Sequence, residues 1–328
     1  MKKLSKVLAL LLALLLLTSV ASLAADLPSG AVLLSDSKKI DPNAVKLIAY
    51  RGLSACAPAN TLAAVTLAGR CGCDGVALDI QPTLDGEWVC ISGVSLKPMT
   101  GYNGTVYTMT VAQLNELTVT GGNGIASYPD EKIPTLRQAI TVANLYNMKL
   151  VLTINGGSDE SQQIIIKNIS NLVNTLKLMG VVQTATVISA EESVLAAVKA
   201  AGGRPALNTL LPLTAVNECI EHGYVGFSAP VTDALTISNA ASRNLEVYGS
   251  DTTTIWGADL LYSLGARTIV SSTIVRHAPE AENVVASIYT KASVAFRNVW
   301  NKIVAFFQNI ITSLALNTLM SQLGINIA

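Results

Sequence analysis

Short apolar runs that suit β-strands alternate with helix-like runs from residue 45 to residue 273, and this alternation constrains the fold most. Such alternation is typical of a parallel sheet covered by helices. Hydrophobic residues make up 50% of the chain and charged residues 13%, which suits strands buried on both faces. We predict eight parallel strands, and therefore an α/β fold of the TIM (β/α)8 barrel type. The predicted strands are Val45–Ala49, Gly75–Ile80, Lys149–Ile154, Thr184–Ser189, Pro205–Leu210, Tyr224–Phe227, Leu245–Gly249 and Thr268–Ser271.

A ninth apolar run, Trp88–Ile91, follows the second strand across the short connection Thr83-Leu84-Asp85-Gly86. This connection is too short to reach a parallel neighbour, and Asp-Gly is a hairpin signal, so we predict an antiparallel extension of strand two. Residues 93–148 then lead to strand three and include a helix-like run, Thr110–Leu117. We predict that they form a small insertion on the C-terminal face of the barrel, where barrel active sites lie.

The first residues have the pattern of a secretory signal. Lys2, Lys3 and Lys6 precede the apolar run Val7–Leu17, and Ser22-Leu23-Ala24 is a small-residue cleavage site, so we predict a signal peptide at residues 1–24. The alternative is an uncleaved anchor, but the apolar run is short of the roughly 20 residues that a span needs. We therefore expect a secreted or extracytoplasmic protein. Removal of three lysines leaves 19 basic residues (22 less 3) against 22 acidic ones, which gives no electrostatic signal for nucleic acid.

The end of the chain carries an amphipathic helical pattern. The predicted organisation is a signal peptide, a barrel at 25–280 and a helical tail at 281–328. Apolar residues recur in the tail at three- and four-residue spacing, with Trp300, Phe306 and Phe307 among them. Three interpretations of residues 281–323 stay open: helices packed on the barrel, a helix at a membrane surface, or a contact in a homo-oligomer.

The cysteines leave their pairing open. Export permits disulfides, and an odd number of cysteines leaves at least one thiol unpaired. Either all are buried thiols or one disulfide joins Cys56 to Cys71 or Cys73. No further ligands accompany Cys71-Gly-Cys73, so a zinc site is not expected. The five cysteines are Cys56, Cys71, Cys73, Cys90 and Cys219.

Motifs between residues 45 and 157 carry a family resemblance. Tyr50-Arg51-Gly52 followed by Pro58-Ala59-Asn60-Thr61 resembles the His-Arg-Gly and Pro-Glu-Asn-Thr of the glycerophosphodiester phosphodiesterase family. Cys73–Ile80 is similar to its Cys-Asp-Gly-Val-Glu-Leu-Asp-Val, and Ile133–Leu136 to its Ile-Pro-Thr-Leu. The resemblance implies a TIM barrel and, in the family, hydrolysis of phosphodiesters. It is fainter from 184 to 273 and absent after 280.

The resemblance also implies a set of catalytic positions. The family uses two histidines as general acid and base, three carboxylates that hold a divalent cation, and an arginine and a lysine at the phosphate. Arg51 and Asp79 keep the arginine and one metal carboxylate. At the other positions the residues differ: the histidines fall on Tyr50 and Ser92, two metal carboxylates on Ala77 and Thr153, and the lysine on Asn155.

These replacements predict a loss of catalysis. One carboxylate holds Ca²⁺ or Mg²⁺ poorly, because these ions bind several oxygen ligands. Tyr50 is a poor base at neutral pH, since the reference pKa of tyrosine is about three units above that of histidine. We expect no cofactor, and Ca²⁺ or Mg²⁺ only if the chain is active. Scaffold residues persist, with Asn60 or Thr61 able to cap the first helix and Pro134 or Thr135 the helix before strand three.

Three further residues are candidates for the site or its surroundings. His222 precedes strand six and is expected at the end of the barrel away from the site, whereas His277 follows strand eight and is expected on the functional face. Asp251, after strand seven, is expected either to pair with Arg51 or to cap its own turn. The ligand-binding candidates are Arg51, Asn60, Asp79, Asn155 and Asp251.

Three hypotheses of function follow. The first is an exported, catalytically inactive barrel that binds a phosphodiester, phosphate or polyol, or serves as a surface interaction module. The second is an active metal-dependent glycerophosphodiester phosphodiesterase of lipid catabolism. The third is a membrane-surface or assembly protein that acts through its C-terminal helix.

Overall fold

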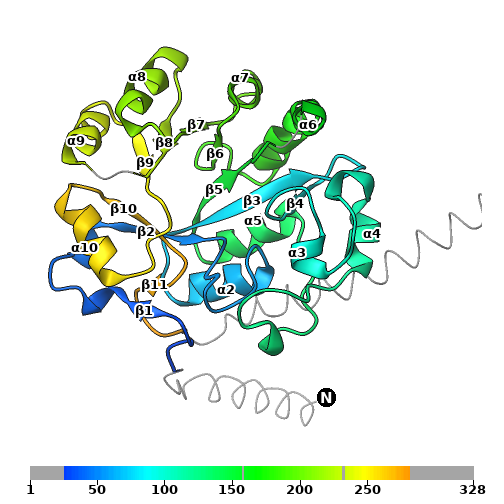
Figure 1. Ribbon diagram of the computed structural model, residues 1–328, viewed down its shortest axis with the longest axis horizontal. Coiled ribbons are helices and arrows are strands. Elements are labelled where there is room, and N and C mark those ends of the chain that lie inside the picture. The colour runs from blue at the N-terminus through cyan, green and yellow to red at the C-terminus, as the bar shows by residue number, and fades with distance from the viewer. Residues whose placement is uncertain (1–25, 157–158, 231–232, 281–328) are drawn as a thin grey trace, which may run out of the picture. The chain divides into compact units, whose positions relative to one another are not determined.

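The computed structural model describes residues 26–156, 159–230 and 233–280, so the predicted signal peptide and the tail at 281–328 lie outside the described residues. Eight parallel strands follow one another around a nearly closed sheet with helices outside it, which confirms the predicted TIM barrel (Figure 1). All eight predicted strands are present, with ends that differ by at most two residues. They are β2 (Lys46–Tyr50), β3 (Gly75–Pro82), β5 (Lys149–Thr153), β6 (Thr186–Ser189), β7 (Pro205–Asn208), β8 (Gly226–Ser228), β9 (Glu246–Tyr248) and β10 (Thr268–Ser271).

Several helices on the outside of the sheet begin at a polar side chain that caps them, and they bury apolar side chains against the sheet. Thr61 caps α2 by accepting a hydrogen bond from the Ala64 amide (3.2 Å), so Thr61 is the cap and not Asn60. Thr135 caps α5 in a capping box with Gln138. The helices are α2 (Leu62–Arg70), α5 (Leu136–Leu145), α6 (Asp159–Leu178), α7 (Glu192–Ala200), α8 (Pro212–His222), α9 (Ala234–Ser242) and α10 (Ile255–Ser263).

The predicted hairpin and the helix after it are both present. Strand β4 (Trp88–Cys90) pairs antiparallel with β3, and Gly86 takes a φ of 76° in the turn between them. The following segment contains α3 (Lys97–Thr100) and α4 (Val111–Glu116), which lie beside β4 in Figure 1. Two short 3-10 turns, η3 (Val106–Thr108) and η4 (Ile125–Ser127), complete it. Apolar residues of this segment between Leu96 and Ile133 share a separate cluster with β4, whereas α5 packs in the main core.

Short elements outside the barrel were not predicted. Strand β1 (Val32–Leu33) pairs in parallel with β11 (Ile274–Val275), and 3-10 turns η1 (Leu34–Asp36) and η2 (Pro42–Ala44) lead into β2. Two-residue strands are too short to leave a periodic pattern, which explains why the sequence did not indicate them. Within the described residues, no helix is both long and apolar enough to cross a membrane.

The cysteines are all thiols in this structure. Cys71, Cys73, Cys90 and Cys219 are buried, and Cys56 is partly buried. Burial raises the pKa of Cys56 to about 11, and burial is also the main cause that raises the pKa of Cys71 to about 12. Because the thiolate is the reactive form, these side chains act as small apolar groups.

Side chains two residues apart on a strand point into the barrel together, which divides the interior into layers. The middle layer is apolar and contains Ile48, Ala77, Val151, Ile188, Ala206, Tyr248 and Val270. Two residues further along, Tyr50, Asp79 and Thr153 lie at the carboxyl ends of their strands, the barrel mouth. Lys46, Lys149 and Glu246 each stand two residues before a middle-layer residue (Ile48, Val151 and Tyr248) and lie at the opposite end, the barrel floor.

Candidate functional site

A strained turn after β2 places Arg51 at the mouth. Arg51 has a φ of 57° and Gly52 a φ of 75°. The Arg51 amide donates to the Ala77 carbonyl (2.7 Å) and the Arg51 carbonyl accepts from the Asn60 amide (2.9 Å). A Cβ on Gly52 would lie 2.6 Å from Ala64 atoms, so only glycine allows the turn to pack against α2.

Asp79, at the mouth end of β3, is enclosed by three partners. Its side chain is 4% exposed, and its Oδ2 lies 2.7 Å from Arg51 Nε in an ion pair. The Ser92 hydroxyl donates to the same oxygen (2.6 Å), and Asn60 Nδ2 lies 3.4 Å from it. Asn60 Nδ2 also donates to Ser92 Oγ (2.8 Å), while its Oδ1 accepts from the Asp79 amide (3.0 Å). The predicted residues Arg51, Asn60, Asp79 and Ser92 therefore form one closed network.

Tyr50 occupies the first histidine position and stays protonated at neutral pH. The Arg51 guanidinium lies over its ring, 4.8 Å from the centroid. Burial raises the pKa of Tyr50, and the carboxylates of Asp79 and Asp251 raise it further against the opposing effect of Arg51. A hydroxyl with a raised pKa is a poor general base, so Tyr50 does not replace a histidine.

The three positions at which the resemblance implies metal ligands lie on the adjacent strands β3 and β5. Asp79 is paired in register with Thr153, and Ala77 precedes Asp79 on the same face of β3. The side chains present are thus a methyl group, a carboxylate and a hydroxyl, where a divalent cation favours several anionic oxygens. Among the described residues, no three His, Cys, Asp or Glu side chains are grouped so that they could hold a metal. This donor set does not fit the Ca²⁺ or Mg²⁺ that the family implies.

Two polar residues that the sequence analysis did not select also reach the mouth. Gln81 is 1% exposed, and its Nε2 donates to the Asn155 carbonyl (2.9 Å). The Tyr107 hydroxyl, from the 93–148 segment, donates to Gln81 Oε1 (3.1 Å). Gln81 follows Asp79 by two residues, a spacing that indicates the same face of β3. Tyr107 had no such signal, because its position depends on the fold of residues 93–148. The Asn155 side chain is exposed.

Asp251 does not pair with Arg51, and the predicted pairing is wrong. Its Oδ1 accepts from the Ser272 amide (2.7 Å) and its Oδ2 from the Ser272 hydroxyl (2.8 Å). It thereby joins the segment after β9 to the end of β10. The predicted cap of its own turn is also not formed, because both oxygens are used across the barrel seam.

His277 lies at the barrel floor, so its predicted place on the functional face is wrong. After β11 the chain runs back towards the loop before β3, where the Arg276 amide donates to the Cys71 carbonyl (3.0 Å). A Cβ on Gly72 would lie 2.5 Å from His277 Nε2, which places the ring against that loop. His222 is at the floor as predicted, at the end of α8, with its ring stacked on Tyr224 (5.3 Å between centroids).

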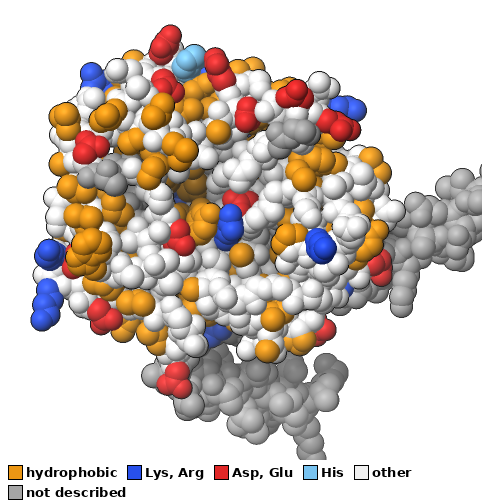
Figure 2. Space-filling view, viewed as in Figure 1, with side chains coloured by type: hydrophobic (Ala, Val, Ile, Leu, Met, Phe, Trp, Pro, Cys, Tyr) orange, Lys and Arg blue, Asp and Glu red, His pale blue; other side chains and the backbone are white. Residues whose placement is uncertain are grey.

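The face seen in Figure 2 is hollowed near its centre, and charged side chains of both signs lie at the edge of the hollow. The Arg51 side chain is 33% exposed, so part of its guanidinium faces solvent. Part of Arg51 is therefore available to donate hydrogen bonds to an anion.

Comparisons with known proteins agree on one family. The model of the glycerophosphoryl diester phosphodiesterase family matches residues 51–249. Glycerophosphodiester phosphodiesterase 1 of Rattus norvegicus is 36% identical over 126 residues, which are 38% of each chain. A probable glycerophosphodiester phosphodiesterase 1 of Mycobacterium tuberculosis is 46% identical over 71 residues, or 22% of this chain and 26% of that one. The chain thus spans less than two fifths of the length of these relatives.

A solved structure is similar over a longer stretch. A phosphodiesterase of Oleispira antarctica, in complex with the product sn-glycerol-3-phosphate, aligns with a TM-score of 0.61 and 26% identity. The alignment covers 69% of this chain and 92% of that one.

Proposed function

This chain belongs to the glycerophosphoryl diester phosphodiesterase family, and we propose that it is a member that no longer hydrolyses phosphodiesters and instead binds a phosphate or polyol at its mouth. One observation carries the proposal. Asp79, the retained carboxylate among the metal positions, has its Oδ2 occupied by Arg51 at 2.7 Å and by Ser92 at 2.6 Å. This oxygen therefore supports the scaffold and is not free for a cation, which leaves at most Oδ1 of one carboxylate for a metal.

The chemistry of hydrolysis requires groups that the described residues of this mouth do not supply. Proton transfer needs a side chain that changes its protonation state near neutral pH. Tyr50 stays protonated, and the Ser92 hydroxyl already donates a hydrogen bond to Asp79. The Oleispira phosphodiesterase binds glycerol 3-phosphate, and the same chemistry suits binding here. Arg51 offers its exposed N–H groups to phosphate oxygens, and Asn155 offers an exposed amide.

Titration calorimetry with sn-glycerol 3-phosphate tests the binding. The Arg51→Gln variant is expected to weaken binding at least about tenfold, because one charge-assisted contact is lost. Lys167→Ala, an exposed residue of α6, is the matched control for the loss of one positive charge. Equal affinity of Arg51→Gln and the wild type would show that the mouth is not the binding site.

Export and a surface role complete the proposal. We place the protein outside the cytoplasm on the predicted signal at residues 1–24, and assign contact with a membrane or a second copy to residues 281–323. Exposed apolar side chains near the starts of α8, α9 and α10 support a surface role for the barrel itself. They are Leu210, Leu211, Leu213, Leu235 and Trp256, each 65% to 83% exposed. Many of the apolar groups on the face seen in Figure 2 lie on the side of these helices.

Liposome co-sedimentation separates the two surfaces. The full chain is compared with a form that ends at Glu282 and with the full chain carrying Trp256→Ser. If the tail holds the membrane, only the shortened form loses binding. Equal binding by the full and shortened forms would remove the tail from the proposal, and loss in Trp256→Ser would assign the contact to the barrel.

A further inference from the structure

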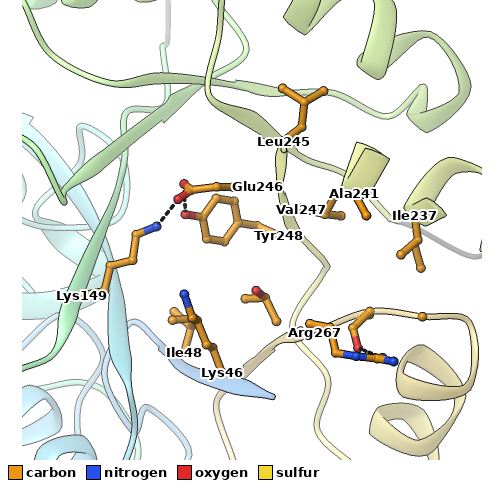
Figure 3. Close-up of a pocket in the computed structure, with 13 residues that line it drawn as sticks. Lys46, Ile48, Lys149, Ile237, Ala241, Leu245, Glu246, Val247, Tyr248 and Arg267 are labelled. Atoms are coloured by element: carbon orange, nitrogen blue, oxygen red, sulfur yellow. Dashed lines mark hydrogen bonds and ion pairs between the residues drawn. The ribbon is translucent and has the colours of Figure 1, made fainter. Parts of the chain in front are cut away.

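The sheet is not fully closed at the barrel floor, and a cavity opens there. Strands β9 and β10 are the two ends of the hydrogen-bonded sheet. Between them lies a cavity of about 160 Å³, lined by Lys46, Lys149, Glu246 and Tyr248 among others (Figure 3). A single water needs only about 10–15 Å³ of such space. A wider depression of about 760 Å³ shares Lys46, Lys149 and Glu246 and adds Arg204.

The carboxylate of Glu246 is saturated by its neighbours. Its Oε1 accepts from Lys149 Nζ (2.5 Å) and Arg204 Nη2 (3.1 Å). Its Oε2 accepts from the Tyr248 hydroxyl (2.7 Å) and the Thr186 hydroxyl (2.9 Å). Figure 3 shows Lys149 and Tyr248 pointing to this carboxylate from opposite strands. Burial alone would raise the pKa of Glu246, but these hydrogen bonds, led by that of Lys149, lower it, so the group stays ionised.

Positive charge exceeds negative charge at this floor. Lys46, Lys149 and Arg204 face one ionised carboxylate, Glu246. The Lys46 side chain is exposed and has no partner among the described residues, and Arg204 Nε is buried without a hydrogen-bond partner there. Nε is shielded from solvent, so an anion would contact Arg204 through the part of its side chain that is exposed, about 30%.

The other charged residues at the edge of the two cavities are already engaged. Asp74 pairs with Arg276 (2.5 Å) and accepts from the Leu47 amide (2.7 Å). Arg267 lies over the ring of Tyr262, 4.6 Å from its centroid, and donates to the Ala266 carbonyl (2.9 Å). Neither changes the balance at Glu246, where the three cations leave an excess of two positive charges.

We propose that the barrel floor binds a small dianion, such as phosphate or the phosphate group of a monoester, between Lys46, Lys149 and Arg204. This site is separate from the mouth. Lys46 and Tyr50 are four residues apart on β2, or about 13 Å at 3.3 Å per residue. The apolar middle layer, including Ile48 and Val151, fills the space between them.

Calorimetric titration of the full chain with inorganic phosphate at low ionic strength tests the proposal. The Arg51→Gln background removes the phosphate contact proposed at the mouth, so the heat that remains reports the floor. In this background, Lys46→Ala is expected to weaken binding about threefold, since Lys46 is exposed. Arg204→Gln is expected to weaken it at least about tenfold. Glu246→Gln is expected to strengthen it, because the competing negative charge is removed.

Lys167→Ala is the control for net charge, and circular dichroism checks the fold of each variant. Lys46 is exposed and unpaired among the described residues, so Lys46→Ala should keep the fold. This variant therefore tests phosphate binding at the floor even if Arg204→Gln unfolds. The proposal is overturned if the Arg51→Gln protein binds no phosphate, or if Lys46→Ala and Lys167→Ala bind it equally. Either result would leave the mouth proposal intact, because that proposal depends on the loss of glycerol 3-phosphate binding in Arg51→Gln.

Discussion

Replacing Asp79 by alanine should destabilise the barrel, because this account makes Asp79 a structural anchor. The substitution removes the acceptor of the Ser92 hydroxyl and the partner of Arg51. A hydrogen bond to a charged group contributes about 1.5–3 kcal/mol. The ion pair adds at most about 1 kcal/mol, since Arg51 is one-third exposed. We expect a loss of about 2–4 kcal/mol, or a fall in Tm of very roughly 4–16 °C for a barrel of this size.

Thermal unfolding followed by far-UV circular dichroism measures this loss. Asp79→Asn is the matched variant: it keeps an oxygen for Ser92 but loses the charge, so its Tm should lie between those of the wild type and Asp79→Ala. A carboxylate kept only for metal binding would give the opposite result, because replacing functional residues is often neutral or stabilising. A Tm of Asp79→Ala equal to or above that of the wild type would refute the reasoning.

Three further predictions concern other parts of the chain. Gly52→Ala should lower the free energy of unfolding, measured in urea, by about 2–4 kcal/mol, because the new Cβ meets Ala64. Gly180→Ala is the control, since Gly180 has a similar φ and open space around it, and it should lower this free energy by about 1 kcal/mol. Equal losses in the two variants would contradict the prediction. Burial raises the pKa of Glu131 to about 7, so the contribution of this group to the free energy of unfolding should fall as the pH rises from about 4.5 to 7. Glu131→Gln should therefore raise the free energy of unfolding by about 1–2 kcal/mol at pH 8 but not at pH 4. Calorimetry with Ca²⁺ or Mg²⁺ should give no micromolar binding; such binding, lost in Asp79→Ala, would contradict the donor set described here.

The strands and the hairpin could be predicted because their signals are local. Each strand is an apolar run between polar segments, and Asp85-Gly86 marks the turn before β4. The convergence of Arg51 and Asp79 could be predicted as well, since the ends of parallel strands meet at one end of a barrel. Ser92 reaches them because β4 pairs antiparallel with β3 and returns the chain to the mouth. The sequence did not decide which residue caps α2. In the structure Asn60 has a φ of 61° and turns its amide to Asp79, which leaves Thr61 as the cap.

Contacts between distant segments could not be predicted in the same way. Lys149 and Glu246 are 97 residues apart, and each resembles an ordinary polar residue at the start of a strand. Only the closure of the barrel brings them together with Arg204 at the floor. His277 was misplaced for a related reason. The rule that a residue after a strand lies at the mouth fails once β11 leaves the barrel to pair with β1.

The central claim, that this barrel has lost phosphodiester hydrolysis, is tested most directly by an assay with glycerophosphocholine. The full chain is incubated with Ca²⁺ or Mg²⁺ beside Asp79→Ala, and release of glycerol 3-phosphate is measured. The account predicts no release above that of a sample without protein, and no difference between the two proteins. Metal-dependent release by the wild type that Asp79→Ala abolishes would contradict it.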